Sequence, residues 1–230
     1  MLSRSTARLL RRPVADVSRR AAALRSFSTA SADMEPSEGA GAFDPANPTP
    51  EHKALREMVK SFTTSEVEPQ ALQYNREERF NRALFERAGE LGLLGVTVDP
   101  EYGGAGMDAT AACIVHEELS YADPAFCLSY LAHSQLFVNN LARNGNVEQM
   151  NRFLPPTCSG EMIGGMGMSE PSCGTDVLAM RSTAKKQADG SYVLNGTKMW
   201  ITNGAVNDTE TGDIFLVYAR TAGPDVRPSK

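Results

Sequence analysis

The spacing of apolar residues changes near residue 162, and this change limits the folds open to the chain. Before it, apolar side chains recur every three or four residues, as on one face of a helix; the first such stripe is Leu55, Met58, Val59 and Phe62. After it, residues 192–202 and 213–220 have the patterns of β-strands. Helices followed by strands, without βαβ alternation, predict an α+β protein. We place an all-α N-terminal domain at residues 49–161 and an antiparallel β domain at residues 162–230.

Capping residues divide the helical region into about five expected helices. The four clearest starts are Thr49 before Pro50, Asn81, Asp108, and Asp123 before Pro124. We expect the second helix to stop near Gly92 and the fourth to end in a left-handed turn at Asn144-Gly145. A last short helix is expected to end at Pro155.

Two turns are expected in the β domain. Asn195-Gly196 within an alternating stretch is typical of a β-hairpin, and Ala188-Asp189-Gly190 predicts another turn. An open sheet that stopped near residue 230 would leave an unpaired edge. We therefore expect this β domain to be incomplete and to expose apolar surface.

The first 27 residues have the composition of a mitochondrial transit peptide. They contain seven arginines, no lysine and one acid, Asp16, with serine and alanine between them. We predict targeting to the mitochondrial matrix; the alternative is a disordered basic arm. Removing residues 1–27 would change the net charge from −5 to −11. Residues 28–48, rich in Ser, Ala, Gly and Pro, are expected to form a flexible lead-in.

Composition argues against several classes of function. No run of about 18 apolar residues is present, so no membrane span is expected. A net charge of −5 gives no basic surface for nucleic acid. The four cysteines form no C-x-x-C pair and the three histidines show no ligand spacing, so neither a metal site nor a disulfide framework is predicted.

Residues 104–109 fit the dinucleotide fingerprint G-x-G-x-x-A. That motif works only where the glycines turn directly from a strand into a helix. Here Asp99 to Tyr102 separate the glycines from the preceding apolar run. A glycine-rich surface loop is therefore favoured over a nicotinamide site.

Residues 167–176, GMSEPSCGTD, concentrate reactive side chains. The nucleophile pattern G-x-S-x-G is absent, because Pro171 stands two residues after Ser169. Pro171 and Gly174 predict an irregular loop after a strand, which would present backbone N–H groups and hydroxyls to an electron-rich ring or an anion. From the residues alone, a cofactor loop and a simple connector remain equally open.

Residues 167–176 and the later stretch 195–204, NGTKMWITNG, resemble the two flavin segments of the acyl-CoA dehydrogenase family. Shorter matches are residues 101–106 and 153–155, and the resemblance covers about residues 50–230. It implies a β-barrel-like middle domain, here truncated, and a C-terminal helical bundle that this chain lacks.

The resemblance also implies a reaction and its partners. Family members use FAD to dehydrogenate an acyl-CoA thioester: a glutamate removes the α-proton, the β-hydride passes to N5 of the flavin, and electrons leave to an electron-transfer flavoprotein. Residues 128–146 are most similar to the branch that acts on short branched-chain substrates of the isovaleryl-CoA type, in leucine catabolism. A homotetramer is implied for the full-length family.

Site residues follow from the same resemblance. Contacts with FAD are implied for Met166, Gly167, Met168, Ser169, Gly174, Thr175, Trp200, Ile201 and Thr202. Trp200 would pack against the ring system, and the Thr202 hydroxyl would lie at its N5 edge. Contacts with acyl-CoA are implied for Thr175, Ser229 and Lys230.

No glutamate in the chain matches the family's catalytic base, which we expect beyond residue 230. Glu170 and Asp176 are expected to shape their loop and not to move protons. A truncated, non-catalytic remnant of such an enzyme is the alternative reading.

Overall fold

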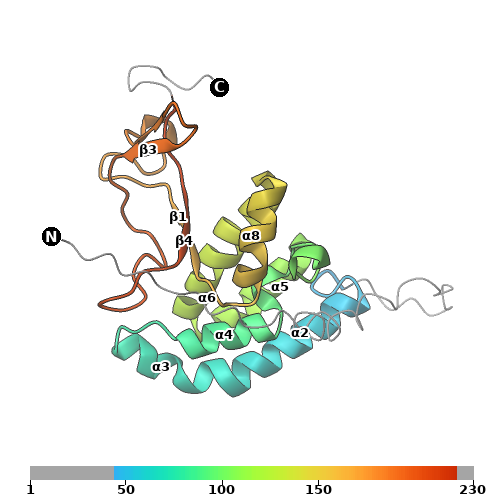
Figure 1. Ribbon diagram of the computed structural model, residues 1–230. Helices are drawn as coiled ribbons and strands as arrows, with labels where there is room; N and C mark the ends of the chain where they lie inside the picture. The colour runs from blue at the N-terminus through green and yellow to red at the C-terminus, as the bar shows by residue number, and fades with distance from the viewer. Residues whose placement is uncertain (1–43, 222–230) are drawn as a thin grey trace, which may run out of the picture.

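The computed structural model describes residues 44–221. The expected transit peptide, most of the expected lead-in, and the predicted CoA contacts Ser229 and Lys230 lie outside the described residues. The order of helices followed by strands is confirmed (Figure 1).

The helical domain forms the lower and right-hand part of the molecule in Figure 1. Its α-helices are α2 (Pro50–Phe62), α3 (Glu68–Arg76), α4 (Arg82–Glu90), α5 (Ala109–Ala122), α6 (Pro124–Leu131), α7 (Asn140–Asn144) and α8 (Val147–Cys158). Two π-helical segments, η2 (Thr63–Val67) and η5 (Ala132–Asn139), continue α2 into α3 and α6 into α7. Two short 3₁₀ segments are η3 (Leu93–Gly95) and η4 (Pro100–Tyr102).

The four expected helix starts are confirmed. In each, the capping side chain accepts a hydrogen bond from a first-turn N–H; the caps are Thr49, Asn81, Asp108 and Asp123. Each such cap stabilises its helix by about 1 kcal/mol. Gly92, at a φ of 75°, ends the α4 turn as predicted.

Two expected helix ends are wrong. Gly145 is extended, with φ −72° and ψ 155°, and not left-handed. A Cβ there would lie 2.6 Å from the Leu141 carbonyl oxygen, so close packing explains the glycine. Helix α8 continues past Pro155 to Cys158. Pro155 and Pro156 lack the N–H groups that would donate to the carbonyls of Asn151 and Arg152. Both of those residues are exposed, so water can bond to their carbonyls instead.

The β domain contains β1 (Gly164–Gly167), β2 (Thr183–Lys186), β3 (Tyr192–Asn195) and β4 (Ile214–Val217), with a short η6 (Val177–Ala179). Strands β2 and β3 are antiparallel around the expected turn, where Gly190 has a φ of 87°. Strands β1 and β4 pair in parallel, against the expectation of antiparallel strands throughout. Parallel pairing is open to them because residues 168–213 provide a long crossover.

The hairpin expected at Asn195-Gly196 is also wrong. Strand β3 ends at Asn195, and Gly196 has a φ of 150°. A Cβ on Gly196 would lie 2.1 Å from the Ser182 hydroxyl. The glycine therefore allows a close approach between segments and does not form a tight turn.

Strands β1 and β4 rise side by side from the helical body, with β3 at the far end of the β domain (Figure 1). Apolar side chains join the two parts: Ile163 lies in the helical core, while Ile214 and Leu216 pack against the cluster around Phe137. A Cβ on Gly164 would lie 2.5 Å from the Phe137 ring. The β1 backbone thus lies directly on η5.

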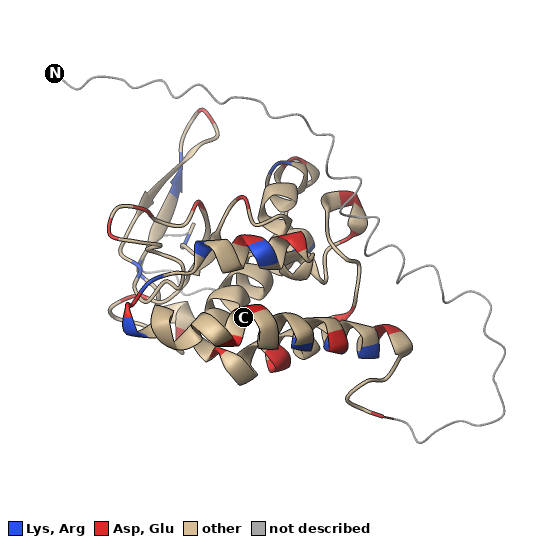
Figure 2. Cartoon of the chain, turned by 90° about the horizontal axis from the view of Figure 1, so that it is seen from below, with Lys and Arg blue, Asp and Glu red and all other residues tan. Residues whose placement is uncertain are grey.

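Charged residues of both signs are interspersed along the helices in Figure 2. Arg56 pairs with Glu117 and Glu118, which links α2 to α5.

Each helix within residues 44–221 is too short or too polar to span a bilayer.

A buried histidine holds the helices and β1 together. The ring of His133, on η5, is fully buried. Its Nδ1 accepts a hydrogen bond from the Gly164 N–H at 2.8 Å, and its Nε2–H donates to the Thr157 carbonyl at 3.0 Å. Burial lowers the pKa of His133 to about 4, although the bond to Thr157 opposes the change. His133 is therefore neutral at pH 7.

We predict that His133 makes the folded chain less stable in mild acid. Below the ordinary pKa of 6.5, the unfolded chain binds a proton that the folded chain excludes until about pH 4. Stability is thus lost as the pH falls through this window, by about 2 kcal/mol between pH 7 and pH 5. Urea unfolding at both pH values measures it. His133→Met should be less stable than wild type at pH 7, but its stability should change less with pH. Equal pH dependence in wild type and His133→Met would refute the assignment.

Candidate cofactor site

The two motif segments, residues 167–176 and 195–204, lie against each other. The Met199 N–H donates to the Ser169 carbonyl at 3.1 Å, and Lys198 Nζ donates to the Met168 carbonyl at 2.9 Å. A Cβ on Gly167 would lie 3.5 Å from the Lys198 and Ile201 side chains. Stretches about 30 residues apart in sequence therefore form one site.

Glu170 is the centre of this contact. It is 4% exposed, and its carboxylate accepts hydrogen bonds from the backbone N–H groups of Arg181 at 2.6 Å and Ser182 at 2.9 Å. Lys198 Nζ adds an ion pair at 2.9 Å. Burial alone would raise the pKa of Glu170, but these donors outweigh it and lower the pKa to about 2. A carboxylate so fixed stays ionised at neutral pH, which fits the structural role expected for it.

Lys198 belongs to the candidate site, although the sequence analysis did not identify it. Its side chain is 9% exposed and its ammonium bonds to both Glu170 and the Met168 carbonyl. Its position inside the alternating, strand-like stretch 192–202 could have indicated a buried ammonium group. A buried ammonium needs an anionic partner, so the sequence also implied a nearby carboxylate. Glu170, within an equally apolar setting, was the candidate partner.

The structure places the predicted cofactor residues in two groups. Met166 and Gly167 belong to β1, and Met168 and Ser169 follow it directly, half-buried beside the second segment. Ile201 and Thr202 are half-buried in that second segment. Gly174 and Thr175 lie exposed on the outer part of the first loop, and a Cβ on Gly174 would meet open space. The structure thus brings the first group together and leaves Gly174 and Thr175 exposed to water.

Trp200 has the most unusual conformation in the site. It is 79% exposed and its φ is +57°, in the left-handed region. This region costs a bulky L-residue about 1–2 kcal/mol, and leaving an indole in water forgoes its hydrophobic burial. Strain in a residue whose side chain packs on little of its own chain points to a surface that receives a ligand or partner.

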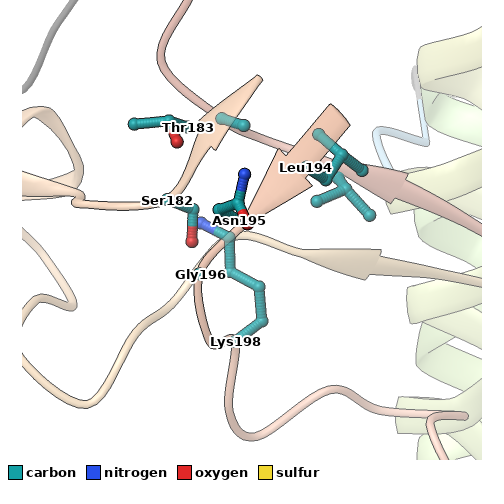
Figure 3. Close-up of a pocket in the computed structure, with 8 residues that line it drawn as sticks. Ser182, Thr183, Leu194, Asn195, Gly196 and Lys198 are labelled. Atoms are coloured by element: carbon teal, nitrogen blue, oxygen red, sulfur yellow. The ribbon is translucent and has the colours of Figure 1, made fainter. Parts of the chain in front are cut away.

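A separate hollow lies between β2, β3 and the end of β4 (Figure 3). Its lining residues are Ser182, Thr183, Leu194, Asn195, Gly196, Lys198, Val217 and Ala219. None of the predicted cofactor residues lines it, but Asn195, Gly196 and Lys198 of the second segment do, so the hollow adjoins the site described above. Within residues 44–221, no group of three or more His, Cys, Asp or Glu side chains is placed to hold a metal ion.

The site offers an exposed indole, two half-buried hydroxyls and a loop with accessible backbone. Such a set suits a flat conjugated ring that carries polar edges, since aromatic faces stack and backbone donors fix orientation. Fold and site together define a two-domain α+β protein with a loop-built candidate ligand site in its β domain.

Two family models match the chain in succession. The N-terminal domain of acyl-CoA dehydrogenase matches residues 49–161, and the middle domain of acyl-CoA dehydrogenase matches residues 165–229. The chain belongs to the acyl-CoA dehydrogenase family.

Relatives with known names agree with this family. The mitochondrial isovaleryl-CoA dehydrogenase of Bos taurus is 42% identical over 173 residues, which cover 74% of this chain and 39% of the relative. The short-chain specific acyl-CoA dehydrogenase of Clostridium acetobutylicum is 37% identical over 175 residues, 76% of this chain and 45% of the relative. The chain therefore spans less than half the length of these relatives.

A solved structure has the same fold. A glutaryl-CoA dehydrogenase from Mycobacterium smegmatis in complex with FADH2 superimposes with a TM-score of 0.70 at 29% identity, over 75% of this chain and 43% of that one.

We predict that removing one partner of the Glu170–Lys198 pair strongly destabilises the folded chain. Lys198→Met leaves a buried carboxylate without its cation, which should cost about 3–5 kcal/mol. The exposed i,i+4 pair Arg82–Glu86 provides the control, since Arg82→Met should cost about 0.5 kcal/mol or less. Urea unfolding compares the two, and the double variant Glu170→Gln/Lys198→Met should lose less than the sum of its single changes. Equal costs for Lys198→Met and Arg82→Met would exclude the proposed importance of the pair.

Proposed function

We propose that this chain supplies the flavin-facing part of an FAD-dependent acyl-CoA dehydrogenase that acts on a short branched-chain thioester of the isovaleryl-CoA type, in leucine catabolism. Family membership supports the reaction class, and relatives named isovaleryl-CoA dehydrogenase at 42% identity support the substrate. A relative named as short-chain specific, at 37% identity, represents a competing specificity. The structural observation that carries the proposal is Trp200, exposed and left-handed beside the Glu170–Lys198 contact.

The residues present fit a flavin. Trp200 would cover the ring with its indole, while Met166 to Ser169 would lie along it with backbone donors. The hydroxyls of Ser169 and Thr202 would donate hydrogen bonds to its polar edges. When bound, FAD supplies the acceptor for the β-hydride of the substrate. The chain's own contribution is to bind and orient, and its fixed donors stabilise negative charge on a reduced ring.

The remaining parts of the proposal concern the substrate and its surroundings. Thr175, exposed on the first loop, would contact CoA or FAD phosphates. Ser229 and Lys230 would contact CoA, and a lysine suits a phosphate as a point charge. Glu170 is excluded as the α-proton base because it is ion-paired and buried. We place that base outside residues 1–230. A mitochondrial matrix location, an electron-transfer flavoprotein partner and a homotetramer complete the proposal; relatives named as mitochondrial support the first.

We predict that FAD quenches the fluorescence of Trp200. The chain contains one tryptophan, so its emission reports this position alone. Titration of the 230-residue chain with FAD should give saturable quenching, because a stacked flavin lies against the indole. The control moves the reporter to Tyr121, an 89% exposed site on α5, by combining Trp200→Phe with Tyr121→Trp. Quenching that is unsaturable, or equal at both positions, would count against a flavin at Trp200.

We also predict that Thr202→Val slows flavin reduction in an enzyme completed by a catalytic domain. The substitution preserves shape and removes one hydroxyl donor, and loss of one such donor costs roughly 10²-fold in rate. Stopped-flow bleaching of the flavin by isovaleryl-CoA measures the rate, and thermal unfolding checks that the variant is intact. An unchanged rate would remove Thr202 from the proposed role.

A further inference from the structure

Asn203 makes contacts with three parts of the molecule, two through its side chain and one through its backbone carbonyl. It is 6% exposed, and its Nδ2 donates to the Ser129 carbonyl at 3.1 Å and to the Gly164 carbonyl at 3.0 Å. Its own backbone carbonyl accepts from the Gly212 N–H at 3.1 Å. Asn203 thus ties the second motif segment to α6, to β1 and to the approach to β4.

The backbone of Asn203 explains why an asparagine serves here. Its φ is +65°, in the left-handed region, which Asn enters more readily than most residues. Trp200 is also left-handed, so two of four consecutive residues need support from outside the segment. The amide of Asn203 provides that support, whereas its Oδ1 is buried with no hydrogen-bond partner. The side chain therefore acts here as a donor.

The two carbonyls that accept from Asn203 lie at the end of α6 and at the start of β1. Ser129 is in the last turn of α6, just before the helix widens into η5, and Gly164 opens the strand that leads into the first motif segment. Thr202, next to Asn203, has its carbonyl 2.9 Å from where a Cβ on Gly165 would be. The path from Trp200 to Thr202 is consequently fixed against both the helical domain and β1.

We propose that Asn203 is a positioning residue for the ligand-facing segment Trp200–Thr202, acting through its amide bonds to Ser129 and Gly164. The inference rests on the proposed function for the identity of the ligand, but the ordering of the segment is independent of it. Nothing in this role requires Asn203 to touch the ligand. Its loss releases the segment while the fold of the helical core remains.

Three substitutions separate backbone from hydrogen bonding. Asn203→Gly keeps the left-handed conformation and removes the amide, Asn203→Asp replaces the donor by an oxygen facing two carbonyls, and Asn203→Ala loses both properties. Asn144→Ala, at an exposed asparagine on α7 with only local bonds to Asn140, is the matched control. Because Trp200 is the chain's one tryptophan, time-resolved fluorescence anisotropy reports on the segment directly.

In the 230-residue chain, each Asn203 variant should increase the fast depolarisation of Trp200 and the amide exchange of residues 199–204. Exchange in α2 and α5 should stay protected, and Asn144→Ala should match wild type. With FAD added, the variants should bind about tenfold more weakly and show a reduced visible circular dichroism band. Unchanged Trp200 anisotropy in Asn203→Gly and Asn203→Asp overturns the inference. If wild type binds no FAD, the proposed function fails, while anisotropy and exchange still decide the role of Asn203.

Discussion

The buried ion pair between Glu170 and Lys198 is the interaction on which the proposed site depends. Removing two charges from water is costly, and such a pair is stable only when its remaining hydrogen-bonding capacity is met. Here two backbone N–H groups, of Arg181 and Ser182, complete the carboxylate, and the Met168 carbonyl accepts from the ammonium. An apolar pair could fill the same space with equal stability. An apolar pair would make no hydrogen bonds to the backbone. The ion pair does, and it thereby fixes how residues 167–176 align with residues 195–204.

A second constraint lies between the β domain and the helices. The β1 backbone rests on η5 because Gly164 has no side chain to clash with Phe137, and the Gly164 N–H is satisfied by His133. The π-helical segment η5 supplies both contacts. π-Helical turns are rare and occur frequently at functional sites. Here the π turn and its buried neutral histidine position the strand that leads into the first motif segment.

Local features of this fold could be predicted from sequence, and long-range ones could not. The capping roles of Asn81 and Asp108 depend on neighbours three residues away, so composition and spacing identified them. The parallel pairing of β1 with β4 joins residues about 50 apart, and no local pattern specifies it. The Asn195-Gly196 pair has the residues of a tight turn, yet the glycine is needed because Ser182 packs directly against it. In the site, the motif residues came from resemblance, whereas the Lys198–Glu170 contact and the left-handed Trp200 required coordinates.

The β domain as described takes its stability from the helices. Each of its two sheets has two strands of four residues, and an isolated pair of that size is marginal in water. Strand β3 exposes Tyr192, Val193 and Leu194 by about half, so little apolar area is buried at that end. The strands that approach the helical core, β1 and β4, carry the buried contacts instead. The order of the ligand-facing residues therefore depends on their hydrogen bonds and packing contacts with the helical domain. Asn203 makes such a contact through its hydrogen bond to the Ser129 carbonyl of α6. A substitution in α6 or η5 should therefore increase the mobility of Trp200 before it destabilises the helical core.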